Sequence, residues 1–217
     1  AQAIPAQVFC TAGSPRAVRA VMKTFATFFL ALAVSPADAY FRSRSSAAKP
    51  AAGNNIVLDV VLKPGEPPAK VRVELRPEWA PLGVAQFKKL VADGSLNEAA
   101  FFRVVPGFIV QFGLPATPQA KMTALQDDPV KVSNTRGTLV FATAGPNTRT
   151  NQLFINLGDN EGLDAQGFSP IGKIVEGMDI VDAINPEYGE DPDQGSITSR
   201  GEDFPNLSKI HSAVTVQ

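Results

Sequence analysis

The stretch from Phe101 to Gly113 constrains the fold of this chain more than any other. Two short runs of β-branched and aromatic residues flank Pro106-Gly107, a dipeptide that marks a turn, so we predict strand, turn and strand. Only Arg103 and Gln111 interrupt the apolar residues with polar side chains. Because a lone buried guanidinium is strongly disfavoured, Arg103 must be paired or face a cleft. The alternative is an edge-strand arginine whose stem covers apolar surface while its head stays in water.

Charge and residue types limit the chemistry available to this chain. The first 55 residues carry six basic side chains and one acid, so the rest holds a net charge of −6 within a total of −1. This acidic part lacks the basic, aromatic-interleaved surface that nucleic-acid binding needs. Cys10 and His211 are the only residues of their types. That excludes a disulfide scaffold, a Cys/His metal site and histidine-dependent nucleophilic catalysis.

The N-terminal region has the pattern of a targeting sequence. Residues 1–21 show little periodicity and no initiator methionine, and we leave them unassigned. Residues 22–39 are predicted to be a secretory signal peptide. Met22-Lys23 supplies the positive start, the run from Phe25 to Val34 the apolar middle, and Ala37-Asp38-Ala39 the cleavage site. The apolar run is too short to span a bilayer, and the alternative is a loosely hydrophobic N-terminal helix.

Residues 40–55 are predicted to be a leader or linker rich in arginine, serine and alanine. An aromatic residue directly after the cleavage site, followed by an acid-poor Arg/Ser segment, resembles the two-part leaders of plastid proteins in algae with secondary plastids. A secreted protein with a flexible mature N-terminus gives the same pattern. We therefore expect delivery to the secretory pathway and extracellular space or to a plastid, not to the cytosol. The mature region shows no transmembrane run.

The folded domain is predicted to span residues 56–217. Short β-rich runs bounded by turn residues recur along it, and Val71–Leu75 alternates apolar and charged residues as a half-exposed strand does. A helical pattern starts at Pro81 and ends at Asp93-Gly94, and a shorter one follows Gly177. These features predict a mostly β chain, closed as an antiparallel barrel and capped by helices. The predicted strands are 56–62, 71–75, two within 101–113, 137–143, 152–157, 171–175 and 213–216.

Ordered motifs along this domain point to one family. They are FFRVVPGFIVQ at 101–111, GTLVFATAGPNT at 137–148, QLFI at 152–155, Leu163-Asp164, and IGKIVEGMDIVD at 171–182. From about Asn55 to the C-terminus the chain closely resembles the cyclophilin-type peptidyl-prolyl cis/trans isomerases. The resemblance implies a closed eight-stranded barrel with two capping α-helices, a shallow apolar groove on its outer face, and isomerisation of X-Pro bonds during protein folding, without a cofactor or metal. It implies proline-containing segments of client proteins as partners, and we expect a monomer.

Arg103 is the residue that we expect to carry catalysis. Rotating an X-Pro amide loses resonance at a barrier of about 18–20 kcal/mol. Because the twisted nitrogen regains its lone pair, a donor aimed at it stabilises the transition state more than the planar ground state. Arginine is always charged and rigidly forked. The resemblance implies substrate-binding roles for Phe108, Ile109, Phe154 and Leu163, which match positions that enclose the proline ring, and for Gln111, Ala142, Thr143, Ala144 and Gln152, which match positions that line the peptide groove.

The chain departs from the family pattern at four places. Phe102 replaces a histidine before the arginine, Thr143 replaces an asparagine, and Gly162 replaces a tryptophan. A further histidine of the family pattern corresponds to a position within Gly167-Phe168, where this chain has none. Because Arg103 is present, we expect turnover to be retained. Loss of the indole N–H and its aromatic face at Gly162 argues against strong binding of the cyclosporin class.

Two other functions fit the same sequence. One is a non-catalytic module that binds or scaffolds proline peptides in the same groove, and the other is a purely structural barrel in a larger assembly. Residues 114–136 are predicted to be a long, polar and irregular connection. Gly158–Gly162 and Asp191–Gly195 hint at calcium loops but lack the spaced ligands of one. Asn206-Leu-Ser208 is an N-glycosylation sequon, relevant only in a secretory lumen, and His211 is assigned no role.

Overall fold

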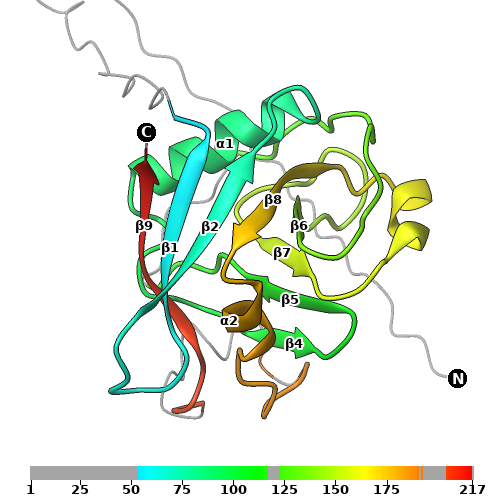
Figure 1. Ribbon diagram of the computed structural model, residues 1–217. Coiled ribbons are helices and arrows are strands. Elements are labelled where there is room, and N and C mark those ends of the chain that lie inside the picture. Colours follow the sequence, from blue (N-terminus) through cyan, green and yellow to red (C-terminus); the bar gives the residue numbers. More distant parts are fainter. Residues whose placement is uncertain (1–52, 117–122, 191, 193–203, 217) are drawn as a thin grey trace, which may run out of the picture. The chain divides into compact units, whose positions relative to one another are not determined.

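A computed structural model describes residues 53–116, 123–190, 192 and 204–216. The unassigned upstream segment, the predicted signal peptide, most of the predicted leader and nearly all of Asp191–Gly195 lie outside these residues. Figure 1 shows short strands accompanied by few helices. The strands are β1 (Asn55–Val61), β2 (Ala69–Leu75), β3 (Ala99–Ala100), β4 (Arg103–Val105), β5 (Ile109–Phe112), β6 (Thr138–Phe141), β7 (Leu153–Asn156), β8 (Pro170–Glu176) and β9 (Lys209–Val216). The helices are α1 (Pro81–Ala92), α2 (Met178–Asp182) and the 3-10 helix η1 (Glu161–Gln166).

The nine strands form one antiparallel sheet in the order β3-β9-β1-β2-β8-β6-β7-β5-β4. Its two ends, β3 and β4, are separated in sequence only by Phe101 and Phe102. The N–H of Phe101 donates to Ser208 O on the β9 side (2.9 Å), and that of Phe102 donates to Gln111 O on β5 (3.1 Å). The segment from β3 to β4 therefore closes the sheet on itself. The prediction of a mostly β, antiparallel, barrel-like fold is confirmed. The structure has nine strands rather than the eight that the family resemblance implied, and β3 and β4 are two separate short strands on either side of Phe101 and Phe102.

Alternation along the strands places one apolar core inside the barrel. In β2, Val71, Val73 and Leu75 are fully buried, whereas Arg72 between them is exposed, as predicted for a half-exposed strand. Phenylalanines from several elements fill the centre, and Phe101 meets Phe112 edge to face with ring centroids 5.3 Å apart. β9 begins at Lys209, four residues before the predicted start, because Ile210 is buried between outward-facing polar residues.

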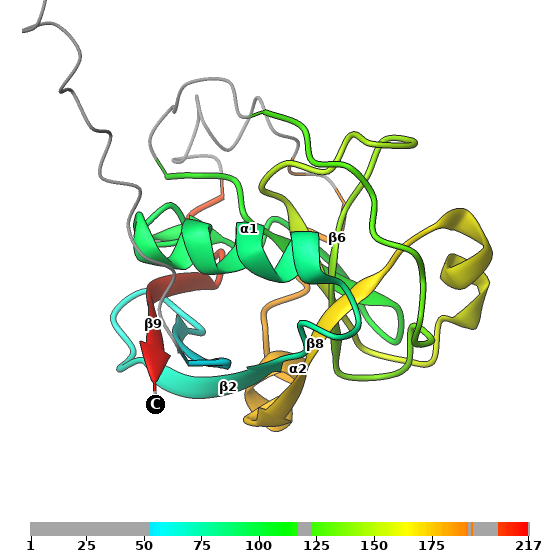
Figure 2. The ribbon, with the colours of Figure 1, turned by 90° about the horizontal axis from the view of Figure 1, so that it is seen from above.

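Two α-helices cover the ends of the barrel, as Figures 1 and 2 show. α1 begins with Pro81 in its first turn and packs Val84, Phe87, Leu90 and Val91 onto the core, in agreement with the prediction. α2 is shorter than the helical pattern after Gly177 and buries Val181. η1 was not predicted. Neither α-helix within the described part of the chain combines the length and the apolar character needed to cross a membrane.

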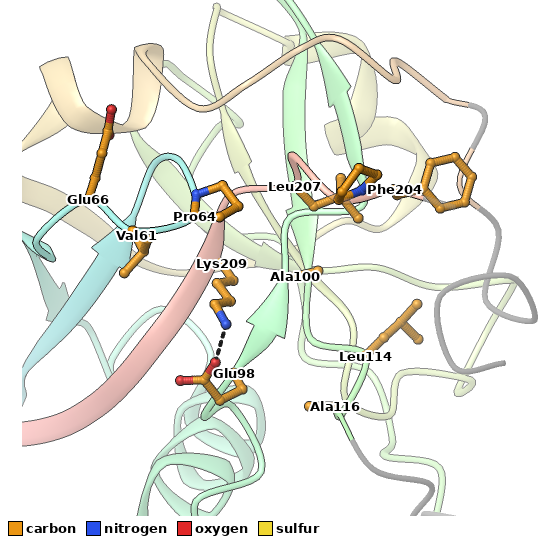
Figure 3. A pocket seen from close by; sticks show the side chains of 12 residues that line it. Val61, Pro64, Glu66, Glu98, Ala100, Leu114, Ala116, Phe204, Leu207 and Lys209 are labelled. Atoms are coloured by element: carbon orange, nitrogen blue, oxygen red, sulfur yellow. Dashed lines mark hydrogen bonds and ion pairs between the residues drawn. The ribbon is translucent and has the colours of Figure 1, made fainter. Parts of the chain in front are cut away.

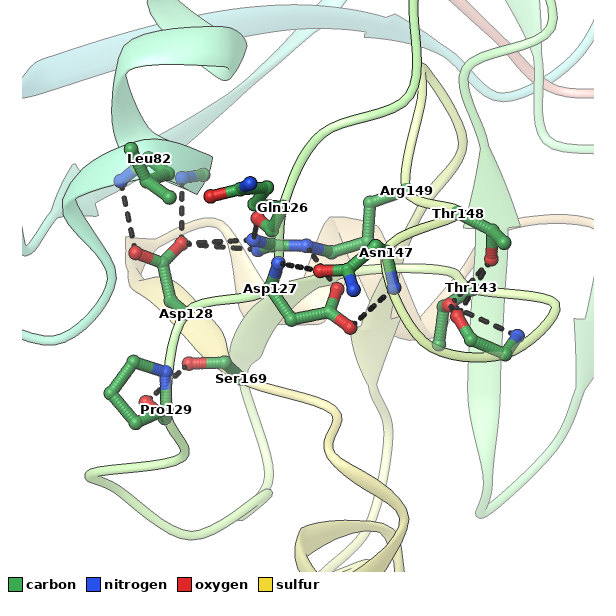
Figure 4. Close-up of polar contacts among 12 residues, drawn as sticks. Leu82, Gln126, Asp127, Asp128, Pro129, Thr143, Asn147, Thr148, Arg149 and Ser169 are labelled. Carbon is green, nitrogen blue, oxygen red and sulfur yellow. Dashed lines mark hydrogen bonds and ion pairs between the residues drawn. The ribbon is translucent and has the colours of Figure 1, made fainter.

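A buried ion pair anchors the connection between β5 and β6, which was predicted to be irregular. The Arg149 side chain is 3% exposed, and its Nη1 and Nη2 both donate to Asp128 Oδ2 at 3.1 Å. Arg149 Nη2 also donates to Gln126 O. The two oxygens of Asp128 accept the N–H groups of Leu82 (3.0 Å) and Gly83 (2.8 Å) in the first turn of α1. The Asp128 carboxylate thus caps the N-terminus of α1 and also neutralises the charge of Arg149 (Figure 4).

The same network holds the loop that follows β6. Asp127 N donates to Asn147 Oδ1 (2.9 Å), and Asn147 N donates back to Asp127 Oδ2 (2.6 Å). Asn147 has φ +57°, a left-handed conformation that asparagine tolerates better than most residues. Figure 4 shows Asp127 between Arg149 and this loop. The connection therefore links α1 to the residues 142–148, which lie in one of the predicted motifs.

Candidate active site

The strand register gathers the predicted site residues on the outer face of the barrel. Arg103 on β4 lies opposite Gln111 on β5, Gln111 lies opposite Phe154 on β7, and Phe154 lies opposite Val140 on β6. Because paired residues of adjacent strands point to the same face, these four form one row across the sheet. The hairpin that starts the row turns at Gly107, whose φ of +76° is a conformation favoured by glycine.

A small apolar cavity of about 180 Å³ lies along this row. Its volume is below the roughly 300–1,000 Å³ of typical small-molecule sites, so it fits a side chain rather than a whole cofactor. Ile109 and Phe154 are at most 4% exposed and form its floor together with the fully buried Val140. The cavity is lined by Arg103, Phe108, Ile109, Gln111, Ala142, Thr143, Phe154, Leu163 and Phe168. We call it the proline cavity, after the role that the family resemblance implies for its residues.

A second, more polar cavity of about 380 Å³ shares Gln111, Ala142 and Thr143 with the proline cavity. Gln111 Nε2 donates to Gln152 Oε1 at 2.8 Å, which fixes both amides at the border. The residues that line this groove cavity are Gln111, Ala142, Thr143, Ala144, Thr148, Thr150 and Gln152. All ten residues predicted for catalysis or substrate binding therefore line one or both of two adjoining cavities. Their chemical roles stay predictions.

The outer wall of the proline cavity comes from η1 and the residues after it. Gly167 ends η1 with φ +85°, and Phe168 then packs edge to face on Phe154, with ring centroids 5.6 Å apart. Phe168 was not assigned to the site, because the sequence match around Gly167-Phe168 was ambiguous. Gly162 is the second residue of the same helix, is exposed, and has no atom of another part of the chain within 4 Å of where a side chain would begin. The departure at Gly162 therefore leaves this side of the wall open.

A polar bracket holds this wall in place. Asp164 accepts hydrogen bonds from Ser133 Oγ (2.5 Å), Asn134 N (2.9 Å) and Asn134 Nδ2 (2.7 Å). Asn134 Nδ2 also donates to Phe168 O at 2.8 Å. Partial burial raises the pKa of the Asp164 carboxyl, but the bonds from Ser133 and Asn134 outweigh it and hold that pKa below its ordinary value. The bracket ties the cavity wall to the connection before β6.

The loop Gly158–Gly162 makes hydrogen bonds that support the strands beneath the proline cavity. Asn160 Nδ2 donates to Phe108 O (2.9 Å) and to Asn156 Oδ1 (2.7 Å), and Asp159 Oδ1 accepts from Arg136 N (2.9 Å). These polar groups therefore support the turn before β5 and the start of β6. Among the described residues no cluster of histidine, cysteine, aspartate or glutamate could hold a metal ion.

Arg103 is paired with a carboxylate and also lines the cavity, so both of the environments expected for it from the sequence are present. Its side chain is 31% exposed, and its guanidinium carbon lies 6.0 Å from the centroid of the Phe108 ring. Its Nε donates to Glu190 Oε1 at 2.6 Å. Glu190 was not assigned to the site, since it lies 87 positions from Arg103 and no local pattern links the two. Phe102, where the family pattern has histidine, is buried and does not line either cavity.

A larger cavity of about 490 Å³ lies elsewhere and contains none of the predicted site residues. Figure 3 shows it between the β1–β2 turn, β3 and β9. Lys209 Nζ pairs with Glu98 at its rim (2.5 Å), and His211 Nδ1 lies 2.7 Å from the other Glu98 oxygen. The Lys209 hydrogen bond lowers the pKa of Glu98, partial burial raises it, the His211 bond lowers it, and the net shift is downward. Size alone therefore does not locate the site.

Comparisons with known proteins found a matching family model and several similar proteins. The chain matches the family model described as cyclophilin type peptidyl-prolyl cis-trans isomerase/CLD over residues 60–202. It is 36% identical over 168 residues to a probable peptidyl-prolyl cis-trans isomerase of Brucella suis, covering 70% of this chain and 80% of that protein. A peptidyl-prolyl cis-trans isomerase of Acinetobacter baylyi is 36% identical over 126 residues, which are 52% of this chain and 65% of that protein. A solved Cryptosporidium parvum cyclophilin-type isomerase has the same fold, with a TM-score of 0.56, 21% identity, and coverage of 76% of this chain and 98% of that one.

Proposed function

Because the chain belongs to the family of cyclophilin-type peptidyl-prolyl cis-trans isomerases, we propose that it isomerises X-Pro bonds in the proline cavity, with Arg103 as the electrostatic catalyst. Proline-containing peptide segments are the substrates of this family. The row of residues across β4, β5, β7 and β6 supports the proposal, because it sets the cationic Arg103 beside the apolar floor of the cavity. The observation that carries it is the position of Arg103 at the cavity formed by Phe108, Ile109 and Phe154.

The physical requirements of the reaction match this arrangement. The uncatalysed flip takes about tens to hundreds of seconds, since a barrier of about 18–20 kcal/mol opposes loss of amide resonance. An apolar cavity holds the pyrrolidine ring, and the groove cavity offers the Gln111 and Gln152 amides to the peptide backbone. A guanidinium N–H then donates to the nitrogen lone pair that exists only in the twisted state. No proton is transferred and no covalent bond is broken.

We further propose that the substrates are client proteins whose folding waits on proline isomerisation, and that the enzyme acts as a monomer outside the cytosol. The signal-like residues 22–39 and the Arg/Ser-rich residues 40–55 support a secretory or plastid destination. Asn206 of the sequon is exposed, as glycosylation in a secretory lumen requires. The exposed Gly162 supports weak binding of cyclosporin-type ligands, because it offers neither an aromatic face nor an N–H donor.

The test is NMR exchange spectroscopy on a blocked X-Pro tetrapeptide with catalytic amounts of the chain. Wild type should accelerate cis/trans exchange, and Arg103→Ala should lower kcat/KM by about 10²–10³-fold, as expected for removing a main electrostatic donor. Arg103→Lys is the matched control, since it keeps the charge without the planar fork. Equal rates for wild type and Arg103→Ala would refute the proposal. Peptide shifts that move on binding without faster exchange would indicate a proline-binding module.

A further inference from the structure

The Arg103 guanidinium is held along one edge and open along the other. Nε and Nη2 both donate to a single oxygen, Oε1 of Glu190, with Nε at 2.6 Å. A guanidinium has five N–H donors, so within the described part of the chain three donors on Nη1 and Nη2 have no partner and could serve a substrate. Among the described residues Glu190 is the only hydrogen-bond partner of this side chain. The side chain of Gln111, which lies opposite Arg103 on β5, donates to Gln152 instead.

The main chain of the loop that follows α2, residues 183–190, brings Glu190 to this place. Val104 N, next to Arg103, donates to Gly189 O at 2.9 Å, which fixes the residue before Glu190 against β4. Gly189 has φ +54° and its N–H donates to Pro186 O at 3.1 Å, so the loop turns tightly just before the carboxylate. The backbone therefore holds the main chain next to Glu190 against β4, within reach of the Arg103 side chain.

A second set of contacts holds the loop from its other side. The Tyr188 ring packs edge to face on Phe204, with centroids 5.1 Å apart, and Tyr188 OH accepts from Asn206 N at 3.3 Å. Asn185 Nδ2 donates to Asn206 O at 3.0 Å. The loop is thus attached to the segment that leads into β9 as well as to β4. Both attachments restrict where Glu190 can lie.

We propose that Glu190 is a positioning residue for the isomerase reaction: it fixes the plane of the Arg103 guanidinium so that the free Nη edge faces the proline cavity. This inference rests on the proposed function. A free arginine side chain loses considerable rotamer entropy when it is ordered. Glu190 removes part of that cost before substrate binds. Substrate and carboxylate do not compete, since they use different edges of the same planar fork.

The size of the effect follows from exposure. Glu190 is 61% exposed and Arg103 31% exposed, and surface ion pairs of this kind contribute only a small free energy. We therefore expect Glu190→Ala to lower kcat about two- to fivefold with KM almost unchanged. Glu190→Gln keeps an acceptor oxygen, so its kcat should lie between those of wild type and Glu190→Ala. Glu190→Asp keeps the charge and should retain part of the wild-type kcat. Glu161→Ala is the matched control, because it removes an exposed carboxylate from the other side of the proline cavity.

Salt gives a readout that a purely structural role would not produce. With an uncharged blocked peptide, 1 M NaCl should bring wild-type kcat toward the Glu190→Ala value, because the screening length falls to about 3 Å. The variant itself should be insensitive to salt. A faster Glu190→Ala variant would overturn the proposal and make Glu190 a competitor of the substrate, and so would an unchanged rate.

A measurement without turnover separates this inference from the proposed function. The Nε–Hε NMR signal of Arg103, assigned by its loss in Arg103→Ala, should be shifted and slow to exchange in the full wild-type chain. In Glu190→Ala it should move into the envelope of free arginines. An unchanged signal would refute the holding of Arg103 by Glu190. A wild-type chain without isomerase activity would refute the proposed function and the catalytic benefit, while this signal would still report whether the pair forms.

Discussion

Arg149 and Arg103 are both paired with carboxylates, but their surroundings differ. Arg149 is 3% exposed and uses its N–H groups on Asp128 and on Gln126 O. Its Nε lies 3.0 Å from Asp127 Oδ1, although the two are not aligned as a hydrogen bond. Arg103 is 31% exposed, and among the described residues its side chain donates only to Glu190 Oε1, through Nε and Nη2. One guanidinium is buried among carboxylates inside the protein, and the other is partly exposed beside an apolar cavity.

The difference shows what separates a structural arginine from a catalytic one in this fold. Both guanidinium groups lie about 6.0 Å from a phenylalanine ring, so aromatic contact does not distinguish them. What distinguishes them is burial and access: the Arg149 side chain is enclosed by the protein, whereas Arg103 is partly exposed and lines a cavity into which its N–H donors can point. Substitutions can test this distinction by the free energy of unfolding, because a buried, paired arginine should contribute more to stability than a partly exposed one.

The largest loss is expected for Arg149→Ala. Removing the cation leaves the buried Asp128 without its partner, and breaking a buried ion pair in this way costs about 3–5 kcal/mol. Urea unfolding can follow Trp79, the one tryptophan of the sequence, which lies just before α1. Asp128→Asn is the matched variant, because it keeps the shape and removes the charge. A loss below about 1 kcal/mol for Arg149→Ala would show that the network is not structural.

The contacts of Arg149 could not be predicted from the sequence, whereas much of the secondary structure could. The strands and α1 could be predicted because alternation, turn dipeptides and helical spacing are local patterns, as in Val71–Leu75 and the Pro81 helix. η1 was missed because its six residues bury no side chain and so carry no periodicity. β9 was predicted too short, since its first half mixes polar residues with the buried Ile210. The network between Arg149 and Asp128 joins positions 21 apart in a segment without a pattern.

The candidate site could be predicted more completely than its supports. All ten assigned residues line the two cavities, because the motifs lie on strands whose register brings them together. Phe168, Asn134 and Glu190 were not assigned to the site. Each acts through a contact with a distant part of the chain, such as the bond from Asn134 Nδ2 to Phe168 O. Contacts of this kind depend on the tertiary fold and leave no local signature.

The second largest effect should come from Asp164→Asn, which weakens the bracket behind the proline cavity. Asparagine keeps one acceptor oxygen but presents an NH₂ group to Ser133 Oγ, so we expect a loss of about 1–2 kcal/mol at pH 7. The pKa of Asp164 is lowered in the folded state, so its stabilisation is present above the unfolded pKa and disappears as pH falls through the folded value. Urea titrations should show the difference between wild type and variant shrinking below about pH 4. A difference that stays constant down to pH 3 would contradict this assignment.

A smaller effect is expected for Glu98→Gln at the larger cavity. Glu98 is 41% exposed and pairs with Lys209 and His211, so solvent screening limits its contribution to about 1 kcal/mol or less. The Lys209 hydrogen bond is the main reason that the pKa of Glu98 is lowered, and the stabilisation should therefore be lost on acidification below about pH 4. Thermal unfolding in 0.15 M and 1 M NaCl should show the loss shrinking with salt. Isomerase activity should not change, and a change would make this cavity part of the site.

The smallest change in stability should follow the substitution with the largest effect on catalysis. Arg103→Ala breaks a half-exposed pair whose partner Glu190 is 61% exposed, so the carboxylate left behind stays hydrated. We expect the free energy of unfolding to change by no more than about 0.5 kcal/mol, measured by urea unfolding beside Arg149→Ala. The same sample should lose the roughly 10²–10³-fold in kcat/KM expected for the electrostatic donor. If Arg103→Ala instead unfolded as easily as Arg149→Ala, its lost activity would no longer identify Arg103 as the catalyst, because misfolding would explain the loss.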